Sequence, residues 1–137
     1  MERILALDVG AKRIGVAATD ELGLTAQGLD TRARTRIRED IEFFRRLAVE
    51  RGVQRIVLGD PRNLDGSFGH ASAAVRDFGA RLERATRLPV DYWDERLTSF
   101  EAEELLRESG VRPDRRSGTV DRIAAVTILK DYLESRG

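Results

Sequence analysis

Three acidic residues, far apart in the chain, have the type and setting for metal-assisted phosphate chemistry. Asp8 ends the apolar segment "ILALD", Glu95 lies just beyond "VDYW", and Asp121 stands at the start of "VDRIAAVTIL". Carboxylates that converge inside a protein repel one another unless a cation neutralises them. Oxygen-only ligands suit hard ions such as Mg²⁺ or Mn²⁺, and one or two such ions can activate water for phosphodiester cleavage. The residue types therefore indicate a divalent-metal site made by Asp8, Glu95 and Asp121.

Each of these acids also has a purely structural explanation. Asp121 would stabilise a helix N-terminus, where aspartate is common, and Glu95 could pair with Arg96 or with an arginine of the later linker. Asp8 is harder to explain in this way, because a strand with two apolar faces rarely ends in an unpaired acid. The spacing alone leaves the metal-site and the structural interpretations both open.

A glycine-flanked turn follows Asp8. Gly10 and Gly15 flank the segment "AKRI", and their small size would let a phosphate approach the backbone beside Lys12 and Arg13. A hairpin turn also uses glycine, so the pattern taken alone does not distinguish the two uses.

The turn-rich loop "GDPRNLDGSFG", residues 59–69, is a second candidate for phosphate contacts. Asn63, Asp65 and Gly66 could present polar groups there, just before a helix start that favours anions. An ordinary turn built from Asn, Asp and Gly explains the same residues, and we favour it slightly. The single histidine, His70, is expected on the surface at the start of the helix.

The basic residues are nearly all arginines, since Lys12 and Lys130 are the only lysines. Arginine suits bidentate phosphate contacts, but genomic base composition explains the same bias equally well. Four arginines alternate along a predicted loop and helix start, a pattern more typical of a solvated segment than of a nucleic-acid track: Arg32, Arg34, Arg36 and Arg38.

Apolar periodicity predicts the elements that must position these residues. Alternation indicates strands, and spacings of three and four residues indicate amphipathic helices. The predicted strands are 3–9, 13–20, 23–30, 54–59 and 88–93, and the predicted helices are 35–51, 70–86, 97–110 and 120–133. The segment "VRPDRRSG", 111–118, is expected to be a polar linker.

This succession predicts an α/β fold with a five-stranded mixed sheet in the order 3-2-1-4-5. The first three strands form an antiparallel meander, and right-handed crossovers place the fourth and fifth strands parallel to the first. Open sheets of this kind carry their sites beyond the carboxyl ends of the parallel strands, where Asp8 lies. Asp121 shares a helix face with Ala124, Ala125 and Ile128, so its carboxylate is expected to point toward the sheet.

Length and composition set outer limits on the function. The 137 residues fit a single domain, 1–137, and the net charge is zero, with 24 basic and 24 acidic residues. Overall charge therefore gives no argument for nucleic acid. Cysteine is absent, which excludes thiolate catalysis and cysteine zinc sites. With no apolar run long enough for a membrane span and no secretory signal, a cytoplasmic protein is expected.

Four segments taken together closely resemble the YqgF family of RNase H-like proteins: "LALDVGAKRIGVA", "GDPRNLDGS", "DERLTS" and "GTVDRIAAVTIL". Members are described as pre-16S rRNA nucleases and were earlier grouped with Holliday-junction resolvases. The resemblance spans nearly the whole chain and implies an RNase H-like fold, with Asp8, Glu95 and Asp121 as ligands of catalytic metal. It also implies that residues of the family's motifs contact nucleic acid: Lys12, Arg13, Asn63, Asp65, Gly66, Arg96, Thr98 and Arg122.

The sequence departs from the family pattern at three places. Asp60 and Arg62 replace apolar residues of the usual "GLPLNMDG" stretch, and we expect Asp60 to be solvated rather than part of the site. Ser117 stands where the family has a basic residue, which puts one phosphate contact in doubt. Ala124 or Ala125 stands where related resolvases carry a fourth acid, so a second ion is expected to bind weakly.

These observations favour a metal-dependent hydrolase that cleaves structured RNA or DNA, with processing of the 5′ end of pre-16S rRNA as the first candidate. Holliday-junction resolution or DNA repair is the alternative, and a non-catalytic RNA- or ribosome-associated module is a third. Sugar kinases and actin-like ATPases begin with a similar hairpin, but they clamp ATP between two such domains. Junction resolution requires two active sites. We expect a monomer or a weak homodimer.

Overall fold

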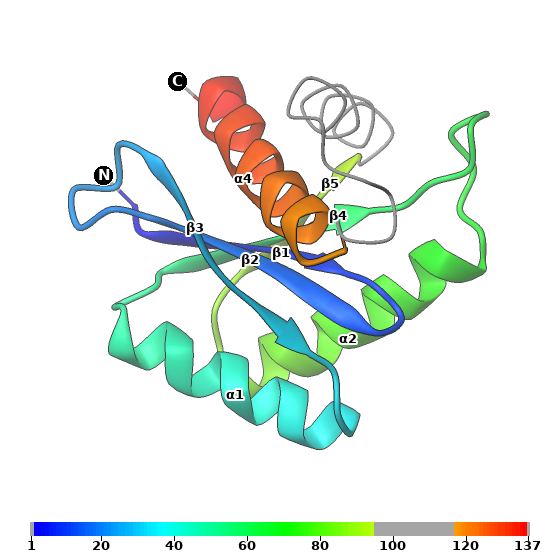
Figure 1. Ribbon diagram of the computed structural model, residues 1–137, viewed down its shortest axis with the longest axis horizontal. Coiled ribbons are helices and arrows are strands. Elements are labelled where there is room, and N and C mark those ends of the chain that lie inside the picture. Colours follow the sequence, from blue (N-terminus) through cyan, green and yellow to red (C-terminus); the bar gives the residue numbers. More distant parts are fainter. Residues whose placement is uncertain (1, 95–116, 137) are drawn as a thin grey trace.

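The computed structural model describes residues 2–94 and 117–136, which form a five-stranded sheet with helices on both faces (Figure 1). The strands are β1 (Ile4–Val9), β2 (Arg13–Thr19), β3 (Ala26–Ala33), β4 (Arg55–Asp60) and β5 (Val90–Asp94). The helices are α1 (Ile37–Glu50), α2 (His70–Thr86) and α4 (Ser117–Arg136). The strand order β3-β2-β1-β4-β5 confirms the predicted mixed sheet.

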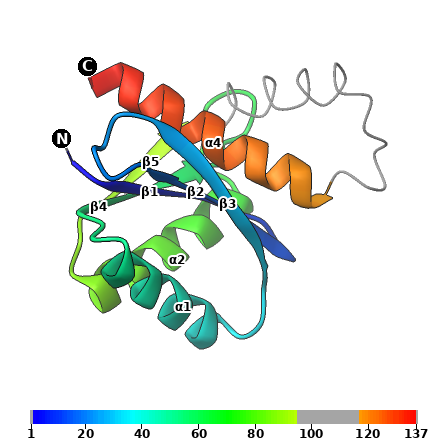
Figure 2. The same ribbon diagram turned by 60° about the vertical axis from the view of Figure 1, so that its left-hand side comes forward.

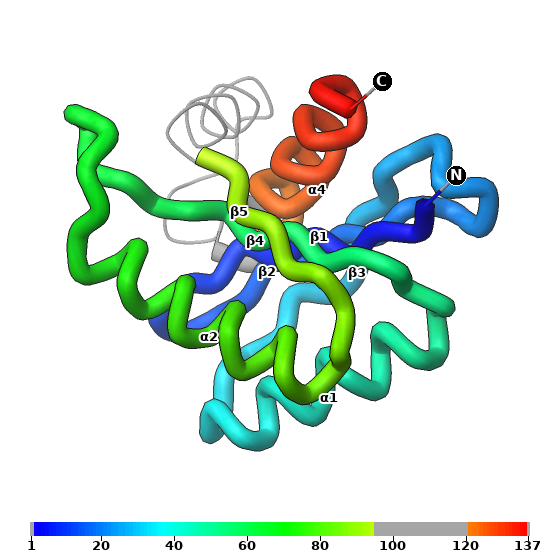
Figure 3. The backbone as a smooth tube through the Cα atoms, turned by 180° about the vertical axis from the view of Figure 1, so that it is seen from behind, coloured from blue at the N-terminus to red at the C-terminus, as the bar shows by residue number. Residues whose placement is uncertain are grey.

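The strand directions bring three carboxyl ends to one edge of the sheet. β1 runs antiparallel to β2 and parallel to β4, and β4 runs parallel to β5. Helices α1 and α2 cover one face, and α4 crosses the other face over β1, β2 and β3. Figure 3, seen from behind, shows β5 beside β4, with α4 on one side of the sheet and α1 and α2 on the other. The ends of β1, β4 and β5 therefore form the edge where such folds carry their sites.

Side chains of β1 alternate between two buried layers, as the pleat of a strand requires. Leu5 and Leu7 pack with residues of α1 and α2, whereas Ile4 and Ala6 pack against α4. Full burial of each leucine or isoleucine contributes about 1.5–3 kcal/mol to stability. The same alternation puts Asp8 on the α4 face, at the point where the apolar run of β1 ends.

The described elements match the predicted ones closely, with two informative differences. β3 begins at Ala26 rather than at residue 23, because Asp20 Oδ1 accepts hydrogen bonds from the backbone N–H groups of Leu24 and Thr25, at 2.8 and 3.3 Å, and closes a turn there. α4 begins at Ser117 rather than at residue 120. The helix therefore includes the last two residues of the segment predicted as a linker.

The predicted helix at 97–110 lies outside the described residues, as do most of the predicted linker and the site candidates Glu95, Arg96 and Thr98. Within residues 2–94 and 117–136, no helix combines the length and the apolar character needed to cross a membrane.

Candidate active site

Asp8 and Asp121 lie close together at the edge where β1 ends. Asp8 is paired with Gly15 across β1 and β2. Helix α4 crosses the sheet over β2 (Figure 1), and a Cβ atom on Gly15 would collide with the backbone carbonyl of Asp121. Glycine at position 15 therefore lets the first turns of α4 rest on the sheet beside Asp8.

The carboxylate of Asp121 points toward the sheet, as predicted, since Ala125 and Ile128 on the same helix face are fully buried. The Asp121 side chain is 19% exposed, and its Oδ2 accepts a hydrogen bond from Arg13 Nε at 3.1 Å. Burial raises the pKa of the Asp121 carboxyl, and the negative charge of Asp8 raises that pKa further, while Arg13 opposes both effects. The two carboxylates are thus near enough to repel each other, and a bound cation would relieve the repulsion.

The donor set suits a hard divalent ion. Asp8 and Asp121 offer only carboxylate oxygens, the donor type that Mg²⁺ and Mn²⁺ prefer. In the part of the chain that the structure describes, no group of three or more His, Cys, Asp or Glu side chains could hold a metal. The third predicted ligand, Glu95, lies outside that part, and in the sequence it follows Asp94, the last residue of β5. Two of the three predicted ligands are therefore brought together.

The two glycines that flank "AKRI" each have a packing reason of their own. The backbone N–H of Gly10 donates a hydrogen bond to the carbonyl of Arg13 at 2.9 Å, and a Cβ atom on Gly10 would lie 2.8 Å from the same oxygen. The side of Gly15 that a Cβ atom would occupy is filled by α4, so the packing of this helix already requires glycine there. Lys12 is exposed on the turn, whereas Arg13 is directed to Asp121.

The loop after β4 forms a compact turn, which is the interpretation that the sequence slightly favoured. Asn63 N–H donates to the carbonyl of Ser67 at 3.0 Å, and Gly66, with φ +88°, donates to the carbonyl of Asn63 at 2.8 Å. Asp65 Oδ1 accepts hydrogen bonds from the backbone N–H and the hydroxyl of Ser67, at 2.9 and 2.6 Å. The side-chain oxygen of Asp65 is thereby engaged within the loop.

Asp60 is fully buried, so the prediction that it is solvated is wrong. Strand alternation places it on the sheet face that α2 covers, opposite to Asp8. The hydroxyl of Ser72 donates to its Oδ1, and Arg62 and Arg76 donate to its Oδ2 at 3.1 and 2.9 Å. Asp60 therefore does not join Asp8 in a metal site.

The Asp60 carboxylate lies at the centre of a small cluster of charged side chains. Burial by itself raises the pKa of Asp60, but hydrogen bonds from Ser72, Arg76 and Arg62 outweigh burial and hold the pKa below its ordinary value of 3.8. Both guanidinium groups also stack on Phe68, at 4.6 and 4.7 Å from the ring centroid. Sequence reasoning missed this cluster, although the alternation of β4 already gave Asp60 the same face as buried apolar residues of the strand.

Two other candidates are on the surface. Arg122 lies on α4 with its NH2 group 3.5 Å from Asp30, and its aliphatic carbons cover Gly28 of β3. It is directed to the outer strand of the sheet. His70 is exposed at the first position of α2, as predicted.

Comparison with known proteins identifies the family of this chain. Residues 2–135 match the RuvX family, described as Holliday junction resolvase. A relative from Syntrophus aciditrophicus is 51% identical over 133 residues, which cover 97% of this chain and 89% of the relative. A relative from Heliobacterium modesticaldum is 44% identical over 134 residues, covering 98% of this chain and 90% of the relative. Both carry the provisional name of pre-16S rRNA nuclease.

Solved structures confirm the RNase H-like fold. Thermus thermophilus RuvC in complex with a Holliday junction substrate aligns with a TM-score of 0.56 at 11% identity, over 98% of this chain and 96% of that one. The Fowlpox virus resolvase in complex with Holliday junction DNA aligns with a TM-score of 0.59 at 12% identity, over 98% of both chains. At these identities the likeness concerns the fold alone.

Proposed function

The chain belongs to the RuvX family of Holliday junction resolvases, and from this membership we propose that it is a nuclease, a hydrolase that cleaves phosphodiester bonds in structured nucleic acid. The relatives' shared name favours RNA as the substrate, specifically the 5′ end of pre-16S rRNA. Relatives at this identity over nearly the full length also support the earlier resemblance to YqgF proteins.

The observation that carries the proposal is the approach of Asp8 to Asp121, with burial and mutual repulsion raising the pKa of the Asp121 carboxyl. A cation bound between two such carboxylates would relieve their repulsion. We propose that Asp8, Asp121 and Glu95 hold Mg²⁺ or Mn²⁺. When bound, the ion would lower the pKa of a water molecule and stabilise the charge that develops on the phosphate.

The remaining side chains would position the substrate. Lys12 is exposed on the turn next to Asp8, where its ammonium group can meet a phosphate. Arg13 orients the Asp121 carboxylate and keeps 40% of its side chain exposed, so it can also contact a phosphate of the substrate. The other proposed nucleic-acid contacts are those that the family motifs imply: Asn63, Asp65, Gly66, Arg96, Thr98 and Arg122.

The helix face beside Asp121 bears on how many ions bind. Ala124 is 4% exposed and Ala125 is fully buried, and both belong to the core under α4. One turn beyond Asp121, then, the chain offers methyl groups where a fourth carboxylate would help to hold a second ion. We propose one firmly bound ion and a weaker second one.

Holliday-junction cleavage is the second candidate, because the family description names it. Resolution of a four-way junction needs two active sites and hence a dimer. A monomer or weak homodimer acting on rRNA requires no such pairing. The oligomeric state on substrate therefore bears directly on the choice.

A cleavage panel tests the proposal. The substrates are a pre-16S rRNA 5′ segment, a four-way DNA junction and matched duplexes, each incubated with Mg²⁺, Mn²⁺ or a chelator. We expect metal-dependent cleavage that is fastest on the rRNA segment and is lost in Asp8→Asn. The matched control is Asp77→Asn, an exposed carboxylate of α2 that pairs with Arg81.

Three results would count against the proposal. Full activity in Asp8→Asn would reject the metal assignment. Faster cleavage of the junction would favour the resolvase alternative. Tight RNA binding without cleavage in any metal would favour a non-catalytic module.

A further inference from the structure

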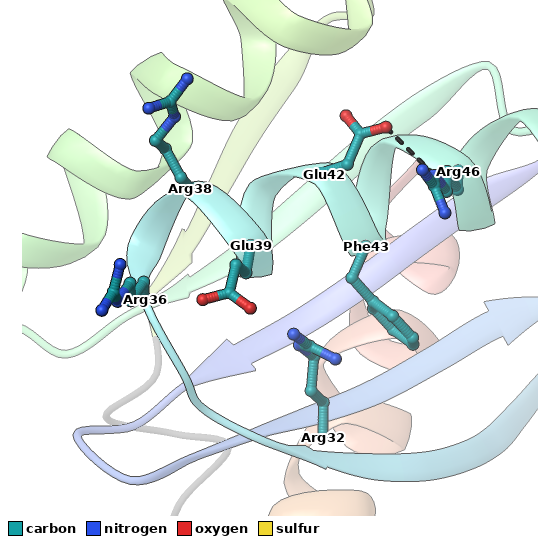
Figure 4. Close-up of a pocket in the computed structure, with 7 residues that line it drawn as sticks. All are labelled: Arg32, Arg36, Arg38, Glu39, Glu42, Phe43 and Arg46. Atoms are coloured by element: carbon teal, nitrogen blue, oxygen red, sulfur yellow. Dashed lines mark hydrogen bonds and ion pairs between the residues drawn. The ribbon is translucent and has the colours of Figure 1, made fainter.

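A groove of about 680 Å³ lies between the end of β3 and α1, apart from the site described above (Figure 4). Its lining combines four arginines, two glutamates and one phenylalanine. The arginines are Arg32 on β3, Arg36 just before α1, and Arg38 and Arg46 on α1. This density of guanidinium groups suits anionic ligands, since each group can donate two parallel hydrogen bonds to a phosphate.

Two of the four arginines already have acidic partners. Arg32 Nε donates to the buried carboxylate of Asp40 at 3.1 Å. Arg46 pairs with Glu42 at 3.1 Å (Figure 4), and Arg45 pairs with the same glutamate at 2.7 Å. The hydrogen bond from Arg45 and the further contact with Arg46 lower the pKa of Glu42 to about 2. Glu42 is therefore charged, and its charge is neutralised by Arg45 and Arg46 of the same helix.

The other two arginines, Arg36 and Arg38, are exposed and have no ion-pair partner among the described residues. The other acidic side chain of the groove, Glu39, is outnumbered by them. Arg36 is also the N-cap residue of α1 and makes no side-chain capping hydrogen bond. The backbone N–H groups of the first turn add positive potential at this end of the groove, which Glu39 and Asp40 in the same turn partly offset.

An aromatic ring forms part of the groove wall. Phe43 is 40% exposed. The Arg32 guanidinium lies over its ring, 4.3 Å from the centroid, and the Phe44 ring packs edge-on with 5.1 Å between the two centroids. An exposed ring beside guanidinium groups is a surface on which a nucleic-acid base or sugar can stack. A small inorganic anion has no base or sugar that could stack on such a ring.

The groove is joined to the Asp8 edge through the backbone. Arg34 N–H donates to the carbonyl of Lys12 at 2.9 Å, and its guanidinium donates to the carbonyl of Gly10 at 3.0 Å. Figure 2 shows the start of α4, the β1–β2 turn and the connection from β3 to α1 one after another along one side of the molecule. The β1–β2 turn, which carries the exposed Lys12, therefore lies between the start of α4 and the connection that leads to the groove.

We propose that this groove is a second anchoring site for the substrate, which holds backbone phosphates of RNA or DNA at a distance from the bond that is cut. Arg36 and Arg38 bind the phosphates, and Phe43 receives a base or a sugar. The inference rests on the proposed nuclease function for the identity of the ligand. It adds a path for the substrate from Asp8 and Asp121 across Lys12 to the start of α1.

The test measures binding in the Asp8→Asn background, so that cleavage does not interfere. Arg36→Gln with Arg38→Gln is compared with a control of equal charge change, Arg81→Gln with Arg84→Gln, two exposed arginines of α2. The probes are an RNA hairpin with long flanks and a hairpin trimmed to the cleavage region. The affinity for the long probe should fall at least about tenfold at ~0.1 M salt, and the slope of log affinity against log salt should shrink by about 0.7 per lost contact with the single-stranded flanks.

The control pair should bind the long probe like the parent protein, and the trimmed probe should not distinguish the variants. Equal affinity of the groove variant and the control for the long probe would overturn the proposal. Inorganic pyrophosphate serves as a second probe. If the parent protein binds pyrophosphate and the groove variant does not, while both bind the long RNA equally well, the groove is a site for free phosphates and the nucleic-acid assignment falls.

Failure of the nuclease proposal would look different. Unchanged cleavage by Asp8→Asn would reject the metal site, and the affinity comparison would then be made with an RNA analogue that cannot be cleaved. Loss of cleavage in Asp8→Asn together with equal binding by both arginine variants would reject the groove alone.

Discussion

Gly15 and Asp121 touch through their backbones, and the contact leaves no room for a Cβ atom at position 15. Gly15 is also the residue that pairs with Asp8 across β1 and β2. A single small residue therefore controls how near α4 comes to the end of β1. The separation of the two carboxylates therefore depends on this packing contact.

Gly15→Ala should push α4 away from β2 and move Asp121 from Asp8. Because the obstacle is backbone rather than a flexible side chain, we expect a loss of about 1–3 kcal/mol in the free energy of unfolding. A shift of a ligand by about 1 Å can cost on the order of 100-fold in rate. Urea unfolding and the metal-dependent cleavage rate measure the two effects.

Gly28→Ala is the matched control for that variant. α4 also passes over Gly28, but there the nearest atom, 2.8 Å from a Cβ, is Cγ of the flexible Arg122 side chain, which can move aside. A smaller loss of stability and nearly normal cleavage are expected. Equal damage in both variants would mean that the spacing of Asp8 and Asp121 is not what Gly15 protects.

The sheet, its strand order and the side of the molecule on which Asp8 and Asp121 meet could be predicted from the sequence. They depend on local periodicity and on the handedness of crossover connections, which act on every chain alike. The burial of Ala125 and Ile128 beside Asp121 follows from the same helix pattern.

The partners of the charged residues could not be predicted in that way. Arg13 was predicted as a phosphate ligand, but its pairing with Asp121, 108 residues further along, has no signal in the local sequence. Asp60 looked solvated because its partners Ser72 and Arg76 come from a different element, and no local pattern links them. Partners of this kind depend on packing between elements, which residue spacing does not encode.

Metal binding should be visible as stabilisation without any substrate. Saturation with Mn²⁺ at about 100 times its Kd would add about 2.7 kcal/mol to the stability of the native protein. Asp8→Asn should lose this gain, yet in chelator it should be at least as stable as the native protein, because the repulsion between Asp8 and Asp121 is gone.

Thermal unfolding with and without Mn²⁺ measures that prediction, with Asp77→Asn as the control that keeps the full gain. An equal rise in Tm for Asp8→Asn and the native protein would place the ion elsewhere.

Ser72→Ala should destabilise the protein through the buried Asp60. The hydroxyl of Ser72 is the donor to Asp60 Oδ1, and both side chains are fully buried. A buried acceptor left without its partner costs about 1–3 kcal/mol. Ser67→Ala removes a comparable hydroxyl bond to Asp65 in an exposed loop and should cost less. Urea unfolding compares the two, and equal losses would mean that burial of Asp60 does not matter.

The stability of the protein should fall in acid through its buried carboxylates, and Asp40 gives the clearest case. Burial alone raises the pKa of Asp40, but hydrogen bonds from the Thr35 backbone and from Arg32 and Arg34 outweigh it, so the pKa in the folded state lies below 3.8. Between that lowered pKa and 3.8 the unfolded chain binds more protons than the folded one. The stabilisation is therefore complete above pH 3.8 and is lost as the pH falls through the folded-state pKa.

Asp40→Asn removes this titrating group and leaves Arg32 and Arg34 without their buried counter-charge. At neutral pH we expect a loss of about 3 kcal/mol, and below pH 3.8 the stability of the variant should change less with pH than that of the native protein. Urea unfolding at a series of pH values gives both quantities. Asp77→Asn, which breaks only an exposed ion pair, should stay within about 1 kcal/mol of the native protein. Parallel pH profiles for Asp40→Asn and the native protein would show that the acid sensitivity arises at another carboxylate.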